Sequence, residues 1–192
     1  MNLDQLRDDC AIKQKKGLHF ILASVLIWCA VFIVQWMTVP MLTKNLYTFC
    51  LTAPLVPLAY FISKGIGVDF TNKTNPLNHL GVLFSINQML YLLIAMWIYP
   101  TIPDKMLMVL AMIFGAHLFP YGWLYKSKSY YVFSVLIPIS MLIIGTNFSS
   151  LYVAGVMVLY EIVFSVLLFF ETRSFVVANE SILSKQQRGS SK

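Results

Sequence analysis

The feature that most constrains this sequence is a series of apolar blocks, each close to 20 residues long, separated by short polar connections. A helix rises 1.5 Å per residue, so about 20 residues cross the roughly 30 Å hydrocarbon core of a bilayer. Inside a bilayer only helices and closed barrels satisfy their own backbone groups. The alternating ten-residue strands of a barrel are absent. The sequence therefore predicts an all-α, polytopic integral membrane protein.

Composition supports this class, because 58% of the residues are hydrophobic and only 11% are charged. A soluble domain carries about 25% charged residues. The net charge of +6 does not indicate nucleic-acid binding, because the basic residues lie between apolar blocks rather than on one face. The cysteines have no CxxC spacing, so neither a zinc site nor a disulfide framework is predicted. No metal and no cofactor are expected.

Six transmembrane helices are predicted within a domain of residues 18–171. Their limits are 18–39, 46–63, 80–99, 106–125, 130–144 and 151–170. The first block is too long for the apolar region of a cleavable signal peptide, so it is interpreted as an uncleaved span. Pro54, Pro57, Pro120 and Pro138 are expected to kink or break their helices.

The segments outside the spans are polar. Residues 1–17 form an N-terminal segment, for which an interfacial helix and a frayed terminus both remain open. Residues 172–192 form a polar tail, which is expected to be disordered beyond Leu183.

Orientation follows from the distribution of basic residues. One side of the predicted topology holds twelve of them, and the other side holds only Lys44 and Lys105. The twelve are Arg7, Lys13, Lys15, Lys16, Lys64, Lys73, Lys126, Lys128, Arg173, Lys185, Arg188 and Lys192. This split requires an even number of spans and predicts that both termini are cytoplasmic.

Glu161, in the middle of the sixth span, is the strongest sign of chemistry. Insertion of the comparable Asp at mid-membrane costs about 2.5–3.5 kcal/mol, so the side chain is expected to face the bundle interior. His117 in the fourth span lies at a similar depth, as do Asn87 and Gln88 in the third. Tyr91 shares their helix face by i+3 and i+4 spacing. We expect these five residues to form a polar layer. Hydrogen bonding between helices is the favoured interpretation of this layer, and a site that binds an ion, a proton or a solute is the alternative.

Small residues in the fourth span indicate close helix packing. Ala111 and Gly115 form a small-xxx-small pair, and Gly122 follows one heptad later. Such residues let two helix backbones approach in a membrane.

Three classes of function remain open. A structural or accessory subunit is favoured, because packing alone can account for each polar residue. The alternative is a small transporter or channel-like protein with a mid-membrane polar site. An intramembrane enzyme has the least support, because no catalytic motif is found. The expected partners are the lipid bilayer and a second copy or another membrane protein.

Four short runs in the sequence carry a resemblance to a family of proteins. They are Lys13-Gln14-Lys15-Lys16-Gly17, Asn75-Pro76-Leu77, Asn87-Gln88-Met89-Leu90-Tyr91 and the run from Gly115 to Ser127. Together they resemble an uncharacterised family of small multi-pass bacterial membrane proteins. The resemblance covers nearly the whole chain and implies a location in the plasma membrane. It brings no catalytic or binding residues.

Overall fold

The computed structural model describes the backbone of residues 2–68, 70 and 74–190, and the side chains of these residues up to 177. All regular elements in this part of the chain are helices. They are α1 Leu3–Lys13, η1 Lys15–Gly17, α2 Leu18–Trp36, α3 Met41–Thr52, α4 Leu55–Ile66, α5 Leu77–Thr101, η2 Pro103–Lys105, α6 Met106–His117, α7 Phe119–Leu124, α8 Lys128–Asn147 and α9 Ser150–Ser190.

Among the described residues, five helical stretches are long and apolar enough to cross a membrane. A sixth span is obtained if α3 and α4, which are bent by 42°, are taken together. The bend falls at Pro54, which has no backbone N–H to continue the helical ladder. The all-α polytopic prediction is therefore confirmed, with the second predicted span broken into two helices.

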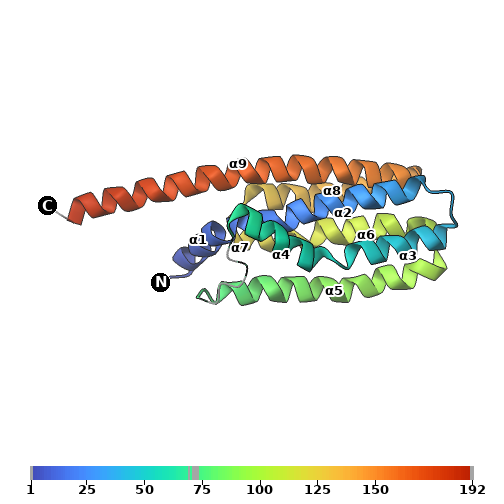
Figure 1. Cartoon of the computed structure of the whole chain (residues 1–192), viewed down its shortest axis with the longest axis horizontal. Coiled ribbons are helices and arrows are strands. Elements are labelled where there is room, and N and C mark those ends of the chain that lie inside the picture. The colour runs from blue at the N-terminus through green and yellow to red at the C-terminus, as the bar shows by residue number, and fades with distance from the viewer. Residues whose placement is uncertain (1, 69, 71–73, 191–192) are drawn as a thin grey trace.

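The helices form one elongated bundle (Figure 1). α2 packs against α9, α6 packs against α8, and α8 also contacts α9. α5 lies along the periphery, and Ala95 is its only buried residue. Both termini lie at the same end (Figure 1), as an even number of spans requires. We call this end, with the 126–129 turn, the basic end.

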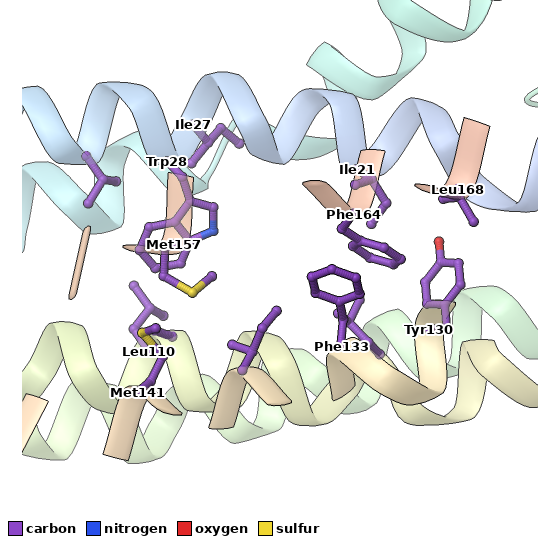
Figure 2. Close-up of a cluster of buried hydrophobic side chains, with 14 of the residues drawn as sticks. Ile21, Ile27, Trp28, Leu110, Tyr130, Phe133, Met141, Met157, Phe164 and Leu168 are labelled. Atoms are coloured by element: carbon purple, nitrogen blue, oxygen red, sulfur yellow. The ribbon is translucent and has the colours of Figure 1, made fainter. Parts of the chain in front are cut away.

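The core lies between the α2–α9 pair and the α6–α8 pair (Figure 2). Phe133 of α8 stacks on Phe164 of α9 with ring centroids 4.7 Å apart. Tyr130 meets the same Phe164 ring edge-on at 4.9 Å. Trp28 and Met157 fill the core further along (Figure 2). These large side chains fix how the helix carrying Glu161 sits against its neighbours.

Small residues bring α6 and α7 close to α8. A Cβ atom added to Gly115 would lie 2.6 Å from the Pro138 Cδ and 2.7 Å from the Ile137 Cβ. One added to Gly122 would lie 2.9 Å from the Tyr131 ring, and Ala111 is fully buried. The helices can approach this closely only because these positions carry almost no side chain.

A buried ion pair ties the basic end together. The Lys16 ammonium, on a side chain only 1% exposed, lies 2.8 Å from the Glu171 carboxylate of α9. Glu171 also accepts hydrogen bonds from the Ser127 and Ser129 hydroxyls and from the backbone N–H groups of Lys128 and Ser129. The carboxylate thus caps the start of α8, where a helix favours negative charge.

α1 is a helix with a capping box formed by Asn2 and Gln5, and it packs against α5, α7 and α9. Burial, helped by the neighbouring Asp9 carboxylate, raises the pKa of the Cys10 thiol to about 11. Partial burial alone would raise the pKa of Asp9, but hydrogen bonds from Lys13 and Asn75 outweigh it and lower the pKa. These contacts hold the N-terminal segment onto the bundle.

The C-terminal segment differs from the prediction. α9 continues without a break from Ser150 to Ser190, so the segment expected to be disordered beyond Leu183 is helical. The reason is that each residue added to an existing helix gains one backbone hydrogen bond as it becomes ordered. No proline interrupts residues 171–190, and the only glycine there is Gly189.

Candidate intramembrane site

Glu161 of α9 is fully buried and points at α2. Its Oε2 is hydrogen-bonded to the hydroxyl of Ser24, which is itself only 3% exposed. The other carboxyl oxygen, Oε1, has no hydrogen-bond partner. A buried carboxyl that lacks a full set of partners is expensive in a membrane, so its retention calls for an explanation.

The Ser24 hydroxyl has two acceptors in reach. Its Oγ lies 2.8 Å from the carbonyl oxygen of Ile21 and also contacts Glu161 Oε2. A hydroxyl has one proton and two acceptor lone pairs. If Glu161 is ionised, Ser24 donates to it. If Glu161 is protonated, the carboxyl donates to Ser24 and Ser24 donates to Ile21. The pair is therefore hydrogen-bonded in either protonation state.

Ser24 also lines a cavity of about 90 Å³ between α2, α4, α5, α6, α7 and α8. Gln88 and His117, two of the predicted site residues, line the same cavity. The hydroxyl-bearing rings of Tyr121 and Tyr130 line it too. A water molecule needs only about 10–15 Å³ of such space. The cavity can therefore hold water or a small solute beside the Ser24–Glu161 pair.

His117 is held in one orientation. Its Nδ1 donates a hydrogen bond to the carbonyl oxygen of Phe114, one turn earlier in α6. A carbonyl can only accept, so Nδ1 carries the proton and Nε2 is the ring's remaining polar atom. The imidazole also meets the Tyr121 ring edge-on at 5.9 Å.

A second cavity, of about 130 Å³, lies nearer the basic end. Asn78 and His19 line it, and both ring nitrogens of the buried His19 lack a hydrogen-bond partner. Ser85 and Tyr121 border both cavities, and their hydroxyls lie 2.7 Å apart. Polar groups thus continue from the basic end to the Ser24–Glu161 pair, with this hydroxyl pair between the cavities.

Two predicted site residues lie elsewhere. Asn87 and Tyr91 are exposed on the outer flank of α5, where the Asn87 Nδ2 donates to the Tyr91 hydroxyl at 2.9 Å. Gln88 follows Asn87 by one residue, which turns its side chain about 100° around the helix toward the cavity. The helix face inferred from spacing is thus split, with Gln88 at the cavity and the other two outside it.

The sequence analysis selected none of Ser24, His19 and Tyr121 as site residues. A serine in an apolar helix is common and carries no signal of its own. His19 lies at the start of the first span, and its side chain is only 1% exposed. Tyr121 lies among the aromatic residues near the end of the fourth predicted span, and it borders both cavities.

Within the described part of the chain, no group of three or more His, Cys, Asp or Glu side chains could hold a metal ion. The hydroxyl, amide and imidazole groups that line the cavity beside Ser24 suit a proton, water or a small polar solute.

The fold and this site define the class: a multi-pass α-helical membrane protein with a buried carboxyl at mid-span. The model of DUF7010, a family of unknown function, matches residues 3–171, and the chain belongs to that family. The match ends at Glu171, so it includes both Glu161 and the ion pair of the basic end. No curated protein and no solved structure matches the chain.

Proposed function

We propose that this protein is a small proton-coupled transporter or channel-like protein, in which Glu161 binds and releases a proton inside the membrane. One observation carries the proposal. The fully buried Glu161 is hydrogen-bonded to Ser24, which lines a cavity large enough for water. An ionisable residue inside a membrane is by default a candidate for an ion or proton path.

The chemistry of the pair supports proton transfer. A proton arriving from water in the cavity is accepted by Ser24 Oγ, while the proton already on Oγ passes to Glu161 Oε2. Ser24 then turns its remaining hydroxyl proton to the Ile21 carbonyl oxygen, whose distance of 2.8 Å allows this. Release follows the reverse order. Glu161 therefore keeps its hydrogen bond to Ser24 both before and after it takes up the proton.

The cavities supply access from one side. His19 and Asn78 border the outer cavity, and the hydroxyls of Ser85 and Tyr121 stand between it and the inner one. A small opening of this hydroxyl pair would join the two cavities. The excess of basic residues supports a cytoplasmic location for this end. The resemblance to bacterial membrane proteins supports the plasma membrane as the location.

Proton flux in proteoliposomes tests the proposal. The purified chain is reconstituted with a pH-sensitive dye inside, and a potassium gradient with valinomycin drives proton entry. We expect flux above that of empty vesicles. We expect Glu161→Gln, which keeps the shape but removes the titrating group, to bring it down to that background. Ser24→Ala should slow the flux.

Ser134→Ala is the matched control for the serine variant. Ser134 is similarly buried, but its hydroxyl donates to the backbone carbonyl oxygen of Tyr131 in its own helix and lies away from the cavity. Wild-type flux is expected in this variant. Absence of flux in the wild type, or undiminished flux in a folded Glu161→Gln variant, would contradict the proposal.

An accessory role is a second candidate, favoured by the exposure of α5. Asn87 and Tyr91 place polar groups on the outer surface of a membrane-spanning helix, where lipid offers no hydrogen-bond partner. A helix of another membrane protein, or of a second copy, would cover them. Cysteines introduced at Leu83 and Leu90, both on the exposed α5 surface, should then crosslink to that partner in native membranes.

A further inference from the structure

An open groove of about 750 Å³ lies at the basic end, away from the cavities of the intramembrane site. It runs between the start of α2, the end of α4 and α9. Leu18 and Leu22 form one side, and Val166, Phe169 and Phe170 form the other. Because these residues belong to two of the membrane-spanning helices, the apolar part of the groove lies at the level of lipid chains.

Two cations border the same groove. Lys15 and Arg173 are among its lining residues, and neither forms an ion pair within the described part of the chain. The Lys15 ammonium donates to the carbonyl oxygen of Ile66, which leaves it two further donor hydrogens. The neighbouring Lys16 differs, because Glu171 neutralises it.

A buried hydroxyl lies in the same wall. Thr172 is 7% exposed, and its Oγ1 has no hydrogen-bond partner. It stands next to Arg173 in the chain and lines the groove. The Oγ1 atom is shielded from solvent, so the two uncompensated cations of the groove, and not this hydroxyl, point to a ligand with acceptor oxygens.

We propose that this groove binds one anionic phospholipid. An acyl chain lies along Leu22, Val166 and Phe169, and the phosphate lies between Lys15 and Arg173. Charge complementarity selects an anionic headgroup, while the apolar walls select a lipid over a free anion. This site is separate from Glu161, so it stands or fails independently of proton flux.

Native mass spectrometry of the full chain tests the proposal. The protein in mild detergent is mixed with phosphatidylglycerol or with phosphatidylcholine of the same chain length. We expect one phosphatidylglycerol retained per chain, in preference to phosphatidylcholine. One basic residue near anionic lipid contributes about a fivefold factor in affinity. Lys15→Gln combined with Arg173→Gln should therefore lower the affinity for phosphatidylglycerol by roughly 30-fold.

Three further variants make the test specific. Lys128→Gln removes the same charge from an exposed position outside the groove and should leave retention unchanged. Val166→Trp fills the groove and should lower retention of both lipids. Thr172→Val keeps the shape of the groove wall and, because Oγ1 is shielded, should leave phosphatidylglycerol binding unchanged.

Several results would overturn the proposal. Equal retention of the two lipids by the wild type would show that the headgroup is not recognised. An equal loss in Lys128→Gln would show attraction to net charge alone. Complete displacement of phosphatidylglycerol by inorganic phosphate would exclude a role for the acyl chain. A change of oligomeric mass in Val166→Trp, with lipid retention intact, would assign the groove to a second copy of the chain.

Discussion

The pair of Lys16 and Glu171 gives the sharpest stability prediction. Lys16 is 1% exposed and Glu171 24% exposed on their side chains, and the charged atoms lie 2.8 Å apart. Breaking a buried pair by removing one partner costs about 3–5 kcal/mol, because the other charge stays buried. The exposure of Glu171 lowers this figure. We therefore expect Glu171→Gln to destabilise the protein by about 3 kcal/mol.

Removal of the other partner should cost less. After Lys16→Met, Glu171 keeps its two serine hydroxyl donors and two backbone N–H donors at the start of α8. We expect a loss of about 1–2 kcal/mol, since methionine fills most of the lysine volume and a carboxylate at a helix start is stabilising. In the double variant no buried charge remains unpaired. Its cost should fall short of the sum of the singles by about 2 kcal/mol.

The assay is chemical unfolding in detergent, followed by tryptophan fluorescence, on the wild type, the two singles and the double. The matched control is the same cycle on Lys13 and Asp9, whose ion pair of 2.7 Å has side chains 43% and 23% exposed. Exposed pairs couple by about 0.2–1 kcal/mol. If the Lys16–Glu171 coupling is no larger than that of the control, the claim that burial makes this pair structurally important is wrong.

Two further predictions concern packing and topology. Gly115→Ala should lower the free energy of unfolding by about 1–3 kcal/mol, since its Cβ would overlap Pro138. Gly65→Ala, where a Cβ would meet nothing within 4 Å, should be neutral or stabilising by up to about 1 kcal/mol in thermal unfolding. A larger loss of stability in Gly65→Ala than in Gly115→Ala would refute the packing argument. A cysteine at Ser149, in the turn before α9, should react with an impermeant maleimide outside intact cells, whereas one at Lys128 should react only after lysis; labelling of Lys128 from outside would reject the orientation.

The sequence alone determined the membrane class and a number of six spans, which the structure matches when the bent α3–α4 pair is taken as one span. Their length and lack of charge leave no other way to satisfy the backbone in lipid. It also pointed to Glu161, because a carboxyl in such a span has to avoid lipid. The even number of spans followed from the distribution of basic residues, and both termini lie at one end of the bundle (Figure 1).

Only the tertiary structure decided which groups meet. Ser24 has no sequence feature that distinguishes it from other serines in apolar helices, and it becomes the partner of Glu161 because the core packing sets the rotation of α2 against α9 (Figure 2). Gln88 and Asn87 are neighbours in sequence, yet one faces the cavity and the other faces outward. Sequence spacing fixes which residues share a helix face, but the direction of that face depends on contacts with helices far away in the chain.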